Sequence, residues 1–157
     1  MKVPKIYIET SVFNFFFADD APDKRQDTLK LFTEIKEGKY APYTSNAVLV
    51  ELAKDSEPKR GQMMALLETY NIEVLPAHAD ESQLANIYVA EGIIPEKYAT
   101  DALHIASTTV NDLDFIVSYN FKHIVKRKTI MMTESINLRE GYKRIGIFSP
   151  TEVIEDE

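Results

Sequence analysis

Residues 5–11, KIYIETS, place a short run of aliphatic and aromatic side chains directly before an acidic residue and two hydroxyl groups. A run of this length and composition predicts a buried β-strand that ends at Ile8. In open sheets of parallel strands, ligands bind beyond the carboxyl ends of the strands, at the switch point where the first strand usually lies. The stretch therefore predicts that Glu9 projects into a crevice, although a surface glutamate after an edge strand is the simpler interpretation of this residue alone.

Short segments rich in aliphatic or β-branched residues recur along the chain, separated by longer stretches with helical periodicity. Strands that alternate with helices imply parallel pairing, with helices on both faces of one sheet. The sequence thus predicts an α/β fold, a three-layer α/β/α sandwich around a central, mainly parallel twisted sheet. The expected strands are residues 5–8, 43–44, 72–75, 115–117 and 145–148. The expected helices are residues 27–37, 45–54, 59–70, 79–91, 100–110 and 134–140.

The composition limits the class of protein. The chain has 157 residues, of which 45% are hydrophobic, so we expect a single domain over residues 1–157, with residues 152–157 as a frayed acidic tail. No apolar run approaches the length of a membrane span and cysteine is absent, which predicts a cytoplasmic protein without membrane contact, disulfides or thiolate metal sites. The formal net charge of −7 disfavours a tight, scanning nucleic-acid binder, but metal ions bound to a nuclease would supply positive charge locally.

Two later acidic residues lie in expected helices. Glu51 lies at the edge of an apolar stripe within residues 45–54, where a solvated helix glutamate is the simpler interpretation. Asp101 lies near the start of the helix expected at residues 100–110, where negative charge interacts favourably with the helix dipole, so a capping role is the simpler interpretation. His104 in the same helix is expected to pack or to make a structural hydrogen bond.

Polar side chains also follow the strand expected at residues 115–117. Ser118 and Asn120 lie at the same edge of the sheet as Glu9, and either can hold a metal-bound water or a phosphate oxygen. Asp112 and Asp114 precede this strand, so we expect them at the far end of the sheet as solvated loop residues. Ser118 and Asn120 therefore join the candidate site, and the two aspartates do not.

A basic run and an aromatic run flank the candidate site. The stretch KHIVKRK at residues 122–128 brings Lys122, Lys126, Arg127 and Lys128 close behind Asn120. Clustered cations beside a crevice are the electrostatic footprint of phosphate binding, and a solvated surface is the competing interpretation. The aromatic residues 13–17 are expected to form core or interface rather than a platform for base stacking.

These segments together resemble the PIN domain family, which includes the VapC-type toxins of toxin–antitoxin pairs. The resemblance is carried by IETSV at residues 8–12, VEL at 50–52, TDALHIA at 100–106 and VSYNFKH at 117–123, and by two closing stretches at 136–142 and 147–150. It implies that Glu9, Glu51 and Asp101 are the acidic metal ligands. It also implies that Ser11 matches the hydroxyl after the first acid, and that Asn120 lies near a fourth, more variable acid.

The resemblance implies a metal-dependent endoribonuclease that hydrolyses RNA phosphodiester bonds with metal-activated water, and it includes the possibility of a toxin. Carboxylate ligands without a histidine–cysteine set favour Mg²⁺ or Mn²⁺ over zinc. The implied partners are RNA, a second copy in a homodimer and an antitoxin protein. Position 9 is more often aspartate in the family, and Asn120 lacks the negative charge of an acid at its position. The sequence therefore leaves open whether the site binds one metal ion or two.

Two other classes of protein share parts of this pattern. A PIN-like module that binds RNA or a protein without cleaving is compatible with the residues at positions 9 and 120 and with the acidic net charge. A receiver-type signalling domain needs paired acids after its first strand, whereas Glu9 is followed by Thr10. The receiver pattern therefore fails, and the non-cleaving module stays as the alternative.

Overall fold

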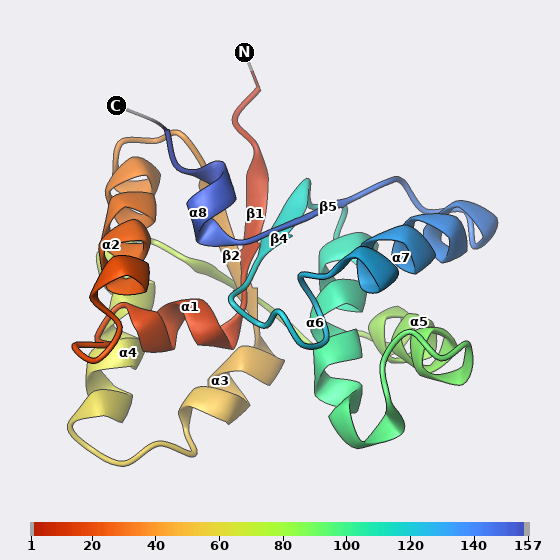
Figure 1. Cartoon of the computed structure of the whole chain (residues 1–157), viewed down its shortest axis with the longest axis horizontal. Helices are drawn as coiled ribbons and strands as arrows, with labels where there is room; N and C mark the ends of the chain where they lie inside the picture. The colour runs from red at the N-terminus through yellow and green to blue at the C-terminus, as the bar shows by residue number, and fades with distance from the viewer. Residues whose placement is uncertain (1, 156–157) are drawn as a thin grey trace.

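Five parallel strands form the centre of the protein in a computed structural model, which describes residues 2–155 (Figure 1). The strands lie in the order β3-β2-β1-β4-β5 across the sheet. The chain fills one side of β1 with β2 and β3, then crosses to the other side for β4 and β5, so the switch point lies between β1 and β4. The predicted α/β class with a parallel sheet is confirmed. The strands are β1 (Lys5–Ile8), β2 (Ala41–Ser45), β3 (Glu73–Leu75), β4 (Phe115–Val117) and β5 (Gly146–Phe148).

Helices cover both faces of this sheet (Figure 1). One face carries α1 (Thr10–Phe15), α2 (Pro22–Lys36), α4 (Lys59–Thr69) and α8 (Pro150–Val153). The other carries α5 (Ala79–Ala90), α6 (Ala99–Val110), which follows the 3-10 turn η1 (Glu96–Tyr98), and α7 (Arg127–Arg139). A short helix, α3 (Asn46–Leu52), lies beneath the carboxyl ends of the strands and contacts both α4 and α6. Within residues 2–155, no helix has both the length and the apolar composition needed to cross a bilayer.

The central strand explains why the first apolar stretch directs the fold. Ile6, Tyr7 and Ile8 of β1 are fully buried, because helices cover the sheet on both sides. Burial on both faces is what gives a parallel strand its continuous apolar sequence rather than an alternating one. Each such side chain contributes roughly 1.5–3 kcal/mol when it is removed from water. Glu9, the next residue, is therefore fixed to a rigid part of the molecule.

Helices α1 and α7 differ from the prediction in ways that bear on the site. Residues 13–17 were expected as an apolar connection, but α1 covers Thr10–Phe15 and begins directly after Glu9, whose side chain accepts the backbone N–H of Ser11 at the helix start. The expected burial of this aromatic stretch is confirmed for Phe13, which is fully buried. Helix α7 begins at Arg127, seven residues before the predicted start. No signal in the sequence marks this start, because the first turn carries cations instead of the acidic residues that usually mark the beginning of a helix.

The C-terminal segment is ordered further than a frayed tail would be. Ser149 and Glu152 form a capping box at the start of α8, and the backbone N–H of Glu155 donates to the Glu34 carboxylate at 3.0 Å. Residues 156–157 lie outside the described part of the chain. Only those two residues of the predicted frayed tail therefore stay untested.

Candidate metal centre

Three acidic residues from separate parts of the chain lie beyond the carboxyl ends of the strands. Glu9 follows β1, and its backbone N–H donates to the Val117 carbonyl at 3.2 Å, which extends the pairing of β1 with β4. Glu51 lies in α3, which begins as soon as β2 ends, and Asp101 lies in the first turn of α6. Because α3 contacts α6 beneath the sheet, the fold brings these elements to one edge (Figure 1).

Glu9 is held by three hydrogen-bond donors on one of its two carboxylate oxygens. The side chain is only 4% exposed. Its Oε1 accepts from the Ser11 backbone N–H at 3.2 Å, from Ser11 Oγ at 2.5 Å and from Ser118 Oγ at 2.6 Å. Within residues 2–155, Oε2 accepts no hydrogen bond. The carboxylate is thus oriented through one oxygen and keeps the other for a ligand.

Glu51 is oriented in the same manner by different partners. Its Oε1 accepts from Thr10 Oγ1 at 2.5 Å and from His104 Nε2 at 2.6 Å. Burial alone would raise the pKa of this carboxyl, but the hydrogen bond and positive charge of His104, with the hydrogen bond of Thr10, lower the pKa below its usual value. Glu51 is therefore ionised at neutral pH, with Oε2 free of hydrogen bonds in the described chain.

His104 lies fully buried between the acids and the sheet. Its Nδ1 is hydrogen-bonded to the Tyr7 hydroxyl at 2.6 Å, while Nε2 donates to Glu51. Burial lowers the pKa of the ring, but the hydrogen bond to Glu51 and the charges of Glu9, Glu51 and Asp101 raise the pKa above its usual value. The predicted structural hydrogen bond of His104 is confirmed, and the ring holds the Glu51 carboxylate in place.

The ligand atoms of Glu9, Glu51 and His104 lie within 4.8 Å of one another, which is close enough for one metal ion. Both ring nitrogens of His104 are already engaged, so we regard the two carboxylates as the better donors and the histidine as a positioning residue. The sequence assigned His104 no part in the site. The sequence could have indicated His104, because it lies three residues after Asp101 and therefore on the same side of α6.

Asp101 lies beside this group but is not one of its three members. Its Oδ2 is paired with His123 Nδ1 at 3.0 Å, and Oδ1 has no hydrogen bond within residues 2–155. Asp101 precedes His104 by three residues in α6, and its charge acts on that ring. The structure thus brings Glu9 and Glu51 together directly. It puts Asp101 one helical turn before His104, with a histidine partner that the sequence did not indicate.

The polar residues predicted around the acids support other groups in the site. The hydroxyls of Ser11 and Ser118, expected to contact substrate, donate to Glu9. The side-chain oxygen of Asn120 accepts the backbone N–H of His123 at 2.9 Å, and the backbone N–H of Asn120 donates to Ser118 Oγ at 2.9 Å. Asn120 therefore shapes the loop that carries His123, the partner of Asp101.

Cations and aromatic rings surround this edge of the sheet. Lys122 is exposed and lies 5.5 Å from the centre of the Tyr98 ring, which in turn stacks at 4.2 Å on His123. Lys24 lies between 5.1 and 5.9 Å from the rings of Phe15, Tyr119 and Phe121. The remaining predicted cations are exposed at the start of α7, in the order Lys126, Arg127 and Lys128.

Comparison with protein-family models and with curated proteins gives no match to this chain. The resemblance to the PIN domain family is therefore a prediction from the sequence. Because one fold supports many activities, the function has to follow from the chemistry of this edge of the sheet.

Proposed function

We propose that the protein is a divalent-cation-dependent ribonuclease that hydrolyses RNA phosphodiester bonds at the Glu9, Glu51 and Asp101 cluster. The observation that carries the proposal is the convergence of Glu9 and Glu51, which approach within 4.8 Å of each other in a partly buried site. Two carboxylates this close repel by roughly 3–4 kcal/mol at the effective dielectric typical of protein sites. A cation bound between them would offset that repulsion.

The donor set fits Mg²⁺ or Mn²⁺. Each of the three carboxylates uses one oxygen for hydrogen bonds or an ion pair and keeps the other free among residues 2–155. Hard divalent cations prefer oxygen ligands, and the two nearby histidines are already paired with Glu51 and Asp101. When bound by the free oxygens of Glu9 and Glu51, such a cation would acidify a water molecule beside Asp101 and neutralise charge on the phosphodiester.

The chain's own residues supply orientation and a proton acceptor. Ser11 and Ser118 fix Glu9, while Thr10 and His104 fix Glu51, so neither carboxylate has to reorganise when substrate arrives. Asp101, stabilised by His123 on Oδ2, would accept the proton of the attacking water on Oδ1.

The surroundings of the cluster suit a nucleic-acid chain. Lys122 precedes His123, the partner of Asp101. Its ammonium group lies over the Tyr98 ring that packs on His123, where it would neutralise a phosphate. Phe121, 48% exposed, offers a ring on which an unpaired base can stack. The choice of RNA as the substrate rests on the resemblance of the sequence to the PIN domain family. Lys122 and Phe121 are compatible with binding of a single-stranded nucleic acid.

The decisive experiment compares Asp101→Asn with Asp112→Asn on a labelled single-stranded RNA. Both changes convert an aspartate into its amide, but Asp112 is exposed at the opposite end of the sheet, paired with Lys143. We expect Asp101→Asn to reduce Mn²⁺-dependent cleavage by more than about 100-fold, the loss for several kcal/mol of missing stabilisation, while Asp112→Asn cleaves like the wild type.

Circular dichroism of both variants checks that the fold is intact. Equal cleavage by the two variants, or cleavage that survives a chelator, would contradict the proposal. RNA binding by the wild type without any divalent-dependent cleavage would favour the alternative, a non-cleaving RNA-binding module.

A further inference from the structure

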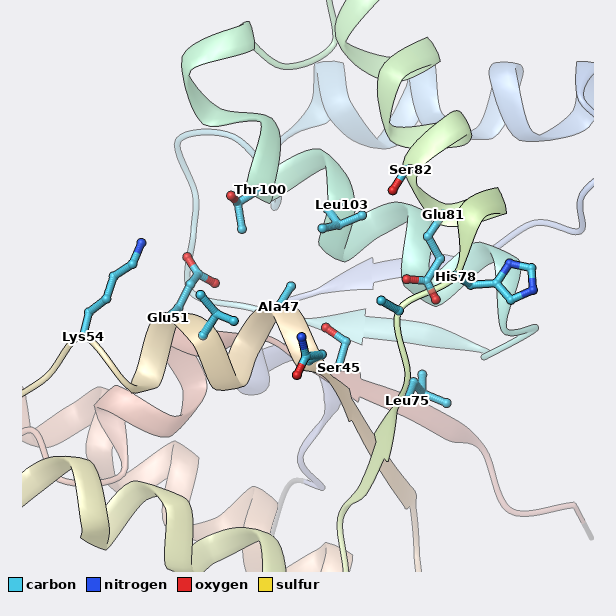
Figure 2. A pocket seen from close by; sticks show the side chains of 13 residues that line it. Ser45, Ala47, Glu51, Lys54, Leu75, His78, Glu81, Ser82, Thr100 and Leu103 are labelled. Carbon is cyan, nitrogen blue, oxygen red and sulfur yellow. The ribbon is translucent and has the colours of Figure 1, made fainter.

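We propose that a cavity beside Glu51 binds a guanine base of the RNA substrate, an inference that rests on the proposed function for its ligand being RNA. The cavity has a volume of about 290 Å³. Its walls come from α3, the end of β3, the first turn of α5 and the start of α6 (Figure 2). It therefore lies at the same edge of the sheet as the acid cluster.

The walls of the cavity suit a flat, partly apolar ligand. Leu75 lines it from the end of β3, Leu103 from α6 and Ala47 from α3 (Figure 2). Val50 of α3 lines it as well. Val50 is 53% exposed, so about half of its apolar surface is open to a ligand. An unpaired base buries its ring faces against such side chains and presents its polar edge to the groups at the end of the pocket.

Glu81 supplies the polar group at the end of the cavity. Its side chain is only 4% exposed, and Figure 2 shows its carboxylate directed from α5 into the pocket. Oε1 accepts the Asn111 side-chain amide at 3.0 Å, while Oε2 accepts no hydrogen bond from residues 2–155. Because Glu81 lines the cavity, this oxygen can accept a hydrogen bond from a ligand that donates.

Guanine is the base whose edge matches this carboxylate. Its Watson–Crick edge presents two adjacent N–H donors, at N1 and N2, which a carboxylate accepts side by side. Adenine and cytosine set one donor beside an acceptor, and uracil flanks its donor with two acceptors, so each would bring an acceptor against the negative oxygen. Base contacts of this paired kind give the discrimination on which sequence recognition depends.

Glu51 connects the cavity to the acid cluster, because it lines the cavity and also belongs to the metal-binding group. A base in the cavity would thus place its attached phosphate next to the carboxylates. Lys54 stands at the exposed side of the cavity, where its ammonium group would meet a backbone phosphate (Figure 2). The cavity would act as a specificity pocket for the nucleotide at the cleavage site.

Binding of the four nucleosides to the metal-free protein tests the inference without any need for cleavage. Guanosine should shift the backbone NMR signals of Ala47, Ser82 and Leu103, with an affinity about tenfold above those of adenosine, cytidine and uridine. The Glu81→Gln variant keeps an oxygen for Asn111 but presents an amide to the ligand, and should lose the preference for guanosine. Ala47→Leu fills the cavity from the opposite wall and should abolish the shifts for all four nucleosides.

Two matched controls lie outside the cavity, on exposed positions of α4. Glu68→Gln and Ala65→Leu repeat the same chemical changes there and should bind guanosine like the wild type. Unshifted signals with guanosine, or equal affinity for all four nucleosides, would overturn the inference even if the enzyme cleaves RNA. Stronger shifts with Nα-acetylarginine amide than with guanosine would also overturn it, and would assign the cavity to a basic side chain of a protein partner. Guanosine-selective shifts in a protein that cleaves nothing would support the pocket and reject the proposed ribonuclease activity.

Discussion

Both ends of the sheet carry acidic residues, but different kinds of groups contact the acidic side chains at each end. At the amino end, Asp114 accepts the backbone N–H of Lys5 at 2.7 Å and lies 3.4 Å from Lys143, which also pairs with Asp112. At the carboxyl end, Glu9 is buried and its donors are the neutral groups of Ser11 and Ser118.

The two ends differ in the groups that balance the acidic charge. At the amino end, the ammonium group of Lys143 balances the exposed carboxylates of Asp112 and Asp114, and nothing further is needed to explain them. At the carboxyl end, Glu9, Glu51 and Asp101 are balanced within residues 2–155 by two histidines and no lysine or arginine ion pair. Crowded carboxylates without a lysine or arginine partner are typical of functional sites.

The largest expected effect that sharpens the comparison is stabilisation by a divalent cation. Mg²⁺ or Mn²⁺ at about 100 times its dissociation constant should add about 2.7 kcal/mol to the free energy of unfolding, because the cation binds the folded carboxyl end. Thermal unfolding followed by circular dichroism measures this as a rise of roughly 5–10 °C in Tm. The same rise in Glu9→Gln would place the cation elsewhere.

The next effect concerns the cations near the carboxyl end. Neutralising Lys126, Arg127 and Lys128 together should weaken RNA binding about tenfold and lower the salt slope of binding by about 0.7 for each phosphate that these side chains neutralise in the wild type. Fluorescence anisotropy over a range of salt concentrations measures both. Neutralising Lys143 and Arg144, which pair with acids away from the site, is the control and should change neither. Equal effects of the two sets of substitutions on RNA binding would contradict a contact between the start of α7 and RNA.

A smaller effect tests whether the acids at the carboxyl end cost stability. Glu9→Gln keeps an oxygen for Ser11 and Ser118 but removes one of three like charges, so the metal-free variant should gain about 1 kcal/mol in free energy of unfolding. Urea denaturation in the presence of a chelator measures the difference. A loss of stability would mean that the Glu9 charge is compensated by the protein alone.

The smallest effect is the opposite change at the amino end. The hydrogen bond from the Lys5 N–H lowers the pKa of Asp114 in spite of partial burial, and Lys143 lowers it further. A carboxyl whose pKa is lower in the folded state stabilises the protein above its unfolded pKa, and this contribution is lost as the pH falls through the folded pKa. Asp114→Asn should therefore lose less than about 1 kcal/mol at neutral pH, given its exposure, and nothing in strong acid. A difference between the variants that stays constant with pH would contradict this assignment.

Local patterns in the sequence predicted much of the fold. The strands β1 and β4 were predicted at their observed bounds, and each of the other three overlaps its prediction, because short apolar runs between helical stretches carry that information. The helix α1 was missed, since its start depends on Glu9 and its aromatic residues are weak helix formers. The sequence also predicted Asp112 and Asp114 as exposed residues outside the site, and both are exposed.

The sequence by itself determined the α/β class, the parallel sheet and the acids that follow its strands, because these features depend on residues close together in the chain. Only the tertiary structure decided that His104 pairs with Glu51, that His123 pairs with Asp101, and that Glu81 closes a cavity beside them. Each of these relations joins segments that are far apart in sequence, and the packing of helices on the sheet sets them. No local periodicity encodes such distances.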